Sequence, residues 1–238
     1  MAIDEAMLIC RSKGEAPNTI RFYAWSPSAV SIGFFQSLRA EVDLEACKNE
    51  GIDVVRRITG GGAVFHDSQG EVTYSLVAGE EEHVVPKDIL HSYQVICSGI
   101  VKGLELLGVA ASFQPINDIV VASKKISGNA QTRRLGVVLQ HGTVLVDADL
   151  HKMFRLLKVS DVKIRDKMIA SAEKRVTTLT RELSRKPQLG DVVEPLRRGF
   201  EQSLRITLAR GELTKEESTI AEQLSKERYS NPDWTSRR

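Results

Sequence analysis

Three consecutive glycines separate two β-prone runs in the segment 56–67, which reads RRITGGGAVFHD. The apolar run 52–58 predicts a strand that leads into the glycines at 60–62, and residues 63–65 predict a strand that follows them. Glycine tolerates positive φ and lets a ligand approach the main chain closely. A loop of this kind can turn several N–H groups toward one anion. The segment therefore predicts a strand–loop–strand unit for an anionic ligand, and a plain glycine-rich hairpin with solvated arginines is the alternative.

The same residues exclude two common anion-binding loops. A Walker loop needs Gly-Lys-Ser/Thr after its glycines, whereas Ala63-Val64-Phe65 follow here. A dinucleotide-binding fingerprint needs another glycine spacing and a helix behind it, whereas the residues after the glycines favour a strand.

A second motif lies in the segment 117–150, NDIVVASKKISGNAQTRRLGVVLQHGTVLVDADL. A short apolar strand is expected at 119–121 and a longer one at 136–146. Polar residues that could carry chemistry stand beside or within these strands: Asn117, Asp118, Lys124, Lys125, Asn129 and His141.

The remaining hydrophobic patterns predict an α+β fold. Apolar residues at helical spacing from 89 to 107 predict a long amphipathic helix, and the capping box at 214–217 predicts the start of another. The expected strands cluster in the middle of the chain, which favours a mainly antiparallel sheet flanked by helices. The polar, basic stretch 163–182 is expected to form a mobile loop with two helical turns at most.

Length and composition limit the class of protein. A chain of 238 residues can bury a single core, so one domain over 1–238 is expected. A formal charge of +2 is too balanced for a general nucleic-acid binder, and no apolar run is long enough to span a membrane. No signal peptide is visible. Cys10, Cys47 and Cys97 form no CxxC pair, so we expect buried thiols in a cytoplasmic protein.

Together the two motifs resemble the lipoate–protein ligase A family, within the biotin/lipoate ligase catalytic fold. The resemblance runs from MAIDEA at 1–6 through RRITGGGAVFHD and KKISGNAQ to the C-terminal tail. It implies a biotin/lipoate ligase-like α+β domain without a C-terminal accessory domain. The tail is similar to that of two-subunit ligases, so we expect a separate small accessory subunit and little adenylate formation by the isolated chain. Because the family usually has a strand before its first helix, we expect a truncated start or a missing edge strand.

The resemblance implies an enzyme that uses ATP and Mg²⁺ to activate lipoate or octanoate as the acyl-AMP. The acyl group then passes to a lysine of an apo lipoyl domain, in E2 subunits of 2-oxo-acid dehydrogenases or in the glycine-cleavage H protein. A carboxylate that attacks a phosphate needs a cationic site. Lys125 is the expected catalytic residue, because a cation about 4 Å from a developing oxyanion contributes roughly 4 kcal/mol at an effective dielectric near 20. That energy corresponds to about three decades of rate.

The resemblance also implies binding roles. The residues expected to contact the acyl-adenylate are Arg57, Thr59, Gly60, Gly61, Gly62, His66, Gly128 and His141. The residues expected to contact the nucleotide are Arg56, Asn117, Asp118, Lys163 and Arg175, with Asp118 also as the Mg²⁺ ligand. For either histidine alone, a structural role is the alternative. The loop around 163–175 is expected to close over the adenylate and exclude water.

Two other functions remain open. The first is an octanoyltransferase of the same fold, which moves octanoyl groups from acyl carrier protein through a cysteine thioester. Such enzymes place the cysteine in a long loop before the strand that leads to the lysine, but the interval 110–116 is short and has no cysteine. The second is a non-catalytic module that binds free lipoate or biotin. Biotin is not expected as the substrate, because the GRGR-type loop of biotin ligases is absent. The sequence does not decide whether lipoate or octanoate is the preferred substrate.

Overall fold

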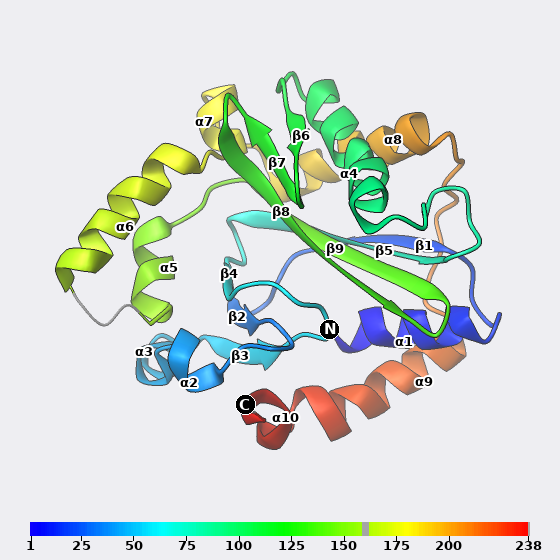
Figure 1. The fold of residues 1–238 in the computed structure, drawn as a ribbon, viewed down its shortest axis with the longest axis horizontal. Coiled ribbons are helices and arrows are strands. Elements are labelled where there is room, and N and C mark those ends of the chain that lie inside the picture. The colour runs from blue at the N-terminus through cyan, green and yellow to red at the C-terminus, as the bar shows by residue number, and fades with distance from the viewer. Residues whose placement is uncertain (159–161, 238) are drawn as a thin grey trace.

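The computed structural model describes residues 1–158 and 162–237, with the backbone alone for residues 162–166. Helices surround two sheets, a six-stranded and a three-stranded one (Figure 1). The expected α+β class with a mainly antiparallel sheet is confirmed, but the strands beside the glycines belong to the smaller sheet. Of the helices in the described ranges, none combines the length and apolar character that crossing a bilayer requires.

The larger sheet has the order β1-β5-β9-β8-β7-β6, and each neighbouring pair is antiparallel. Its strands are β1 (Thr19–Tyr23), β5 (Glu71–Gly79), β6 (Ser112–Gln114), β7 (Asp118–Val121), β8 (Lys124–Arg134) and β9 (Val137–Leu145). Leu135 and Gly136 connect β8 to β9 with φ of 56° and 72°. Positive φ at both positions of a two-residue turn matches the twist of a β-hairpin. The register of this hairpin places Gly128 opposite Thr143.

The smaller sheet carries the glycine loop. Its central strand β2 (Ala29–Ile32) pairs in parallel with β3 (Asp53–Arg56) and antiparallel with β4 (Val64–His66). The short helices α2 (Leu38–Glu41) and α3 (Leu44–Asn49) make the crossover between the two parallel strands. The chain from β3 to β4 must therefore pass over the end of β2, and the glycines lie in that connection.

The main core lies between the larger sheet and the helices α4 (Ile89–Leu106) and α8 (Leu189–Leu204). Figure 1 shows these two helices side by side over the sheet. They approach closely because both present glycine at the crossing, and a Cβ added to Gly199 would lie 2.3 Å from Gly103 N. The helices α1 (Ala2–Ser12) and α9 (Lys215–Leu224) pack together, and α1 also packs against β5 and β9 of the larger sheet. The expected long helix and the capping box of Thr214 and Glu217 are both confirmed.

The stretch expected as a mobile loop is instead largely helical. It forms α6 (Val162–Arg175) and, after a short turn, α7 (Leu179–Leu183). The segment 162–175 contains no glycine or proline and is rich in lysine, arginine and alanine, which favour helices. The buried side chain of Ile169 and the preceding helix α5 (Leu150–Leu156) give α6 a packing surface. The polar composition therefore reflects an exposed helix face.

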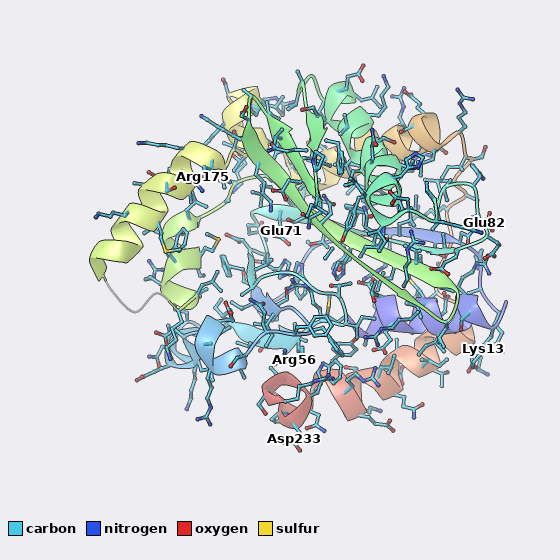
Figure 2. All side chains as sticks on the ribbon, viewed as in Figure 1. Lys13, Arg56, Glu71, Glu82, Arg175 and Asp233 are labelled. Atoms are coloured by element: carbon cyan, nitrogen blue, oxygen red, sulfur yellow. The ribbon has the colours of Figure 1, made fainter. Side chains whose placement is uncertain are left out.

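The chain ends with a one-turn π-helix, η1 (Ser225–Tyr229), and α10 (Pro232–Ser236). Figure 2 shows Arg56 between β3 and this last helix. Its guanidinium is fully buried and donates to the carbonyls of Trp234 and Thr235 and to three carbonyls of the segment 33–36. Arg56 thus fixes the C-terminal helix against the strand that leads to the glycine loop.

Candidate active site

A cavity of about 360 Å³ lies between the two sheets. The glycine loop and β4 line it from the smaller sheet, and β5, β8 and β9 line it from the larger sheet. The start of α5 and the residue after α6, Val176, complete the wall. Figure 2 shows Glu71, one of the lining residues, near the centre of the molecule. The two sequence motifs therefore meet at one cavity.

Lys125 lines this cavity at the start of β8. Its Nζ lies 2.7 Å from Oδ1 of Asp118, on the neighbouring strand β7. Both side chains are partly exposed, so they mark the solvent-facing side of the cavity. A Cβ added to Gly128 would lie 2.7 Å from the same Nζ, so this glycine gives the lysine side chain its room. The motif KKISGNA thus places the ammonium group of Lys125 over Gly128 and beside the carboxylate of Asp118.

Asn117 and Asn129 join β8 to the turn before β7. Asn129 donates Nδ2–H to the carbonyl of Asn117 over 2.9 Å, and Asn117 returns a hydrogen bond to the carbonyl of Asn129. Tyr74 donates its hydroxyl to Oδ1 of Asn129 over 2.7 Å. Gly142 faces this side chain, since a Cβ there would lie 2.0 Å from Oδ1. These contacts fix the wall next to Lys125 and occupy the Asn117 amide.

Arg57 holds the glycine loop from within. Its Nε and Nη2 donate to the carbonyl of Gly60 over 3.2 and 2.9 Å, and Nη2 also donates to the carbonyl of Gly62 over 2.6 Å. Its Nη1 donates to the carbonyl and to Oγ of Ser31 over 3.1 and 3.0 Å. These five bonds match the five N–H donors of a guanidinium. Contact of the Arg57 guanidinium with the acyl-adenylate, as expected from the resemblance, would therefore require some of these bonds to break.

The loop is also packed tightly against β2. Gly61 has φ 95°, in the region that favours glycine. A Cβ added to Gly33 would lie 2.0 Å from the carbonyl oxygen of Gly61. The amide of Phe34 donates to the carbonyl of Thr59 over 2.9 Å. The shape of the loop thus depends on a glycine outside the RRITGGG motif.

His141 is buried on β9 behind the loop. Its Nε2 lies 2.7 Å from Oγ1 of Thr59, and its Nδ1 lies 3.5 Å from Oδ2 of Asp4. Asp4 also forms an ion pair with Arg21 over 2.7 Å. Burial lowers the pKa of His141 below its ordinary value. Arg21, and to a smaller extent His141, hold the pKa of Asp4 far below its usual range despite burial. His141 is therefore a neutral ring near pH 7.

His66 lies at the end of β4 and faces the buried part of the cavity. Its Nδ1 lies 2.7 Å from Oε1 of Glu71, and its Nε2 lies 2.8 Å from Oγ of Ser31. The ring stacks on Trp25 with a centroid distance of 4.1 Å. Thr73 donates its hydroxyl to the same Oε1 over 2.9 Å. Both of the histidine's nitrogens are therefore occupied by protein groups.

Comparison with known proteins identifies the family. The family model for the lipoyl protein ligase A/B catalytic domain matches residues 1–201. The chain belongs to this family. Octanoyltransferase LipM from Brevibacillus brevis is 36% identical over 261 residues, which cover 100% of this chain and 94% of the relative. The bi-partite lipoate protein ligase of Thermoplasma acidophilum, from a structural study with its E2 lipoyl domain, superimposes with a TM-score of 0.87. It is 34% identical, with 99% of this chain and 89% of that chain covered.

A third relative carries a nucleotide. The crystal structure of lipoate-protein ligase A bound with ATP superimposes with a TM-score of 0.84 and 31% identity, over 99% of this chain and 92% of that chain. The resemblance of the two motifs to the lipoate–protein ligase family is thus confirmed. The names of the curated sequence relatives favour the octanoyltransferase alternative over the expected ATP-dependent ligase. Identity to the two kinds of relative is nearly equal, so identity alone does not separate them.

The cavity brings together most of the residues that the resemblance singled out. Those that line it are Arg57, Gly61, Gly62, His66, Asn117, Lys125, Gly128 and His141. Those that do not line it are Arg56, Thr59, Gly60, Asp118 and Arg175. Thr59 supports His141, Asp118 supports Lys125, and Arg56 binds the C-terminal helix. Arg175 is exposed at the end of α6, and the side chain of Lys163 lies outside the described residues.

The three thiols lie away from this site. Cys10, Cys47 and Cys97 are buried, and none of them lines the cavity. Burial raises the pKa of Cys47 to about 11 and that of Cys97 to about 12, and it also raises the pKa of Cys10. A nucleophilic thiolate needs exposure and a lowered pKa. The cysteines of this chain therefore have the properties of core residues.

The sequence alone did not point to several residues that support the site but lie outside the two motifs. Ser31, Glu71 and Asp4 are buried polar side chains with partners in the cavity wall. The one available signal was polarity in runs expected to be buried, such as Glu71 at the start of the strand 71–79. A buried carboxylate is costly unless it is paired, so its position indicates a partner.

Proposed function

We propose that this chain transfers a medium-chain acyl group, octanoyl or lipoyl, to the ε-amine of a lysine in a lipoyl domain. The observation that carries the proposal is the position of Lys125 and the glycine loop on one cavity. Lys125 can stabilise the oxyanion that forms when an amine attacks the acyl carbonyl. The solved structure of the Thermoplasma acidophilum ligase with its E2 lipoyl domain supports a lipoyl domain as the acceptor.

We further propose an acyl-adenylate as the donor. In the first step an oxygen of the carboxylate attacks the α-phosphorus of ATP, the bond to the β-phosphate oxygen breaks, and pyrophosphate leaves. In the second step the neutral lysine amine of the carrier attacks the acyl carbonyl, the bond to the AMP oxygen breaks, and the amine loses a proton to solvent. Neither step needs a thiol, and none of Cys10, Cys47 and Cys97 reaches the cavity.

The cationic groups near the cavity suit this donor. Lys125 lies beside Asp118, and Mg²⁺ binds in proteins through one or two carboxylates together with phosphate oxygens. Among the described residues no cluster of three or more His, Cys, Asp or Glu is arranged as a preformed metal site. To bind a metal that arrives with ATP, Asp118 would have to exchange its contact with Lys125 for the metal, and Mg²⁺ would then neutralise phosphate charge. A small accessory subunit that assists the first step remains part of this proposal.

Octanoyl transfer from acyl carrier protein is the second candidate, and the curated relatives named octanoyltransferase favour it. The cavity accepts the same acyl group in either case. The difference lies in the nucleophile, because a thioester intermediate needs a reactive cysteine. The alignment with the relative from Brevibacillus brevis covers 261 positions against the 238 residues of this chain, so 261 − 238 = 23 positions or more of the alignment have no residue in this chain.

A comparison of donors separates the candidates. The chain is incubated with an apo lipoyl domain and either octanoyl-acyl carrier protein or octanoate with ATP and Mg²⁺, with and without an accessory subunit. Mass spectrometry of the carrier lysine reports transfer. We expect modification with ATP and none from the thioester. Modification from the thioester alone, lost when the three cysteines are replaced by alanine, would establish the second candidate. A carrier left unmodified by both donors would refute acyl transfer.

A further inference from the structure

A continuous chain of hydrogen bonds connects the buried carboxylate of Glu71 to the glycine loop. Glu71 contacts His66 over 2.7 Å, His66 contacts Ser31 over 2.8 Å, and Ser31 contacts Arg57 over 3.0 Å. Arg57 in turn donates to the carbonyls of the loop at Gly60 and Gly62. This series of hydrogen bonds starts on β5 of the larger sheet and ends at the glycine loop of the smaller sheet. It therefore ties the two sheets together across the cavity.

The direction of each hydrogen bond follows from the chemistry of the groups. An ionised carboxylate only accepts, so Nδ1 of His66 carries the proton that is donated to Glu71. In a neutral ring, Nε2 then accepts the hydroxyl proton of Ser31, and the oxygen of that hydroxyl accepts from Arg57. The order of the chain fixes the tautomer of the ring and the orientation of the hydroxyl. Each member depends on the one before it.

The two ends of this hydrogen-bond chain can carry opposite charges. Glu71 and Arg57 are both buried, and among the described residues Arg57 has no ion pair with a carboxylate. Burial lowers the pKa of Arg57 to about 10, and its direct partners are uncharged oxygens. A buried charge is costly unless other groups compensate it. Glu71 is a buried carboxylate that is connected to Arg57 through two intervening polar groups, which can polarise one another.

We propose that Glu71 is a positioning residue for the acyl site, acting through His66 and Ser31 on Arg57 and thereby on the glycine loop. This positioning role rests on the proposed function for the identity of the acyl ligand. Glu71 fixes the wall against which the acyl chain packs. Loss of its charge loosens the loop and weakens acyl binding, and leaves the binding of the carrier domain unchanged.

The test uses Glu71→Gln in the full chain. The amide keeps an acceptor for His66 but removes the charge, and a charge-assisted hydrogen bond is roughly twice as strong as a neutral one. We expect octanoate, measured by calorimetry, to bind about tenfold more weakly. We also expect the KM for octanoate to rise in the same proportion while the KM for the lipoyl domain is unchanged. Amide hydrogen exchange at residues 60–63 is expected to accelerate without a ligand present.

A matched control separates positioning from general stability. Glu217→Gln removes another buried carboxylate, and glutamine serves equally in a capping box. This control is expected to leave octanoate binding and loop exchange at wild-type values. Ser31→Ala interrupts the chain at another point, so it tests the proposal even where Glu71→Gln fails to fold.

The double variant of Glu71→Gln and Ser31→Ala gives the sharpest result. If Glu71 acts through Ser31, the double variant loses no more than about twofold beyond Ser31→Ala, because interacting residues are not additive. Losses that multiply, or an unchanged octanoate affinity and loop exchange in Glu71→Gln, would overturn the positioning role. A wild-type chain that binds octanoate but modifies no carrier would instead refute the proposed function while these binding measurements still decide the role of Glu71.

Discussion

Nζ of Lys125 lies 2.7 Å from Oδ1 of Asp118, and only the lysine lines the cavity. The carboxylate thus orients the ammonium group from behind. We expect Asp118→Asn to lower kcat for acyl transfer about tenfold, because a charge-assisted bond that aims the lysine becomes a neutral one. Because the pair is partly exposed, the free energy of unfolding should change by less than about 1 kcal/mol. Steady-state kinetics and urea unfolding check both values, and unchanged kcat would show that Lys125 orients itself.

Gly128 is the second support of this lysine. An alanine there would place its Cβ 2.7 Å from Cε and Nζ of Lys125, which are the mobile end of a side chain. We therefore expect Gly128→Ala to fold normally but to lose at least about tenfold in kcat, since small displacements of a catalytic group are costly. Gly190→Ala is the control, because an added Cβ there meets nothing within 4 Å. Equal activity of both variants would contradict the arrangement.

Arg56 is expected to act on stability. Its guanidinium is buried and donates to carbonyls of the C-terminal helix and of the segment 33–36. Arg56→Met leaves these acceptors without donors, so we expect a loss of about 3 kcal/mol in the free energy of unfolding. Guanidinium chloride unfolding measures this loss. Arg210→Met, at an exposed position of the loop before α9, is the comparison and should change stability by less than about 0.5 kcal/mol. Similar values for the two variants would show that the buried bonds contribute little.

We expect the buried His141 to make the free energy of unfolding depend on pH. Burial lowers its pKa in the folded state below the ordinary value of 6.5, so the unfolded chain binds the proton more tightly. The stabilisation by neutral His141 is present above pH 6.5 and is lost as the pH falls from 6.5 toward the folded-state pKa. We expect His141→Gln to unfold with a flatter pH profile in this window. Urea unfolding at several pH values measures it, and identical slopes for both proteins would contradict the assignment.

The sequence predicted the local parts of the site because their signals are local. The run of glycines between β-prone residues and the pattern KKISGNA each lie within one short segment, and both segments reach the cavity. The α+β class and the long helix followed from hydrophobic spacing. The roles assigned to the individual site residues stay predictions until variants are measured.

The remaining features depend on contacts between distant residues. Arg56 stands next to Arg57 in the motif, yet one binds the carbonyl of Thr235 and the other binds the glycine loop. Neighbours along a strand point to opposite faces, so a motif alone cannot place both. The pairing of Glu71 with His66 and Ser31 likewise depends on how two sheets face each other. The helix α6 was missed because its polarity outweighed its good helix propensity in the prediction.

The central claim is that Lys125, without any thiol, supports acyl transfer. The most direct measurement is the single-turnover transfer of octanoyl from synthetic octanoyl-AMP to an apo lipoyl domain. We expect a chain with Cys10→Ala, Cys47→Ala and Cys97→Ala to keep wild-type transfer within about threefold, since all three are buried away from the cavity. Lys125→Ala should lose about three decades, and Lys124→Ala, on the exposed neighbour, should lose none. A folded cysteine-free chain without transfer, or full transfer by Lys125→Ala, would contradict the claim.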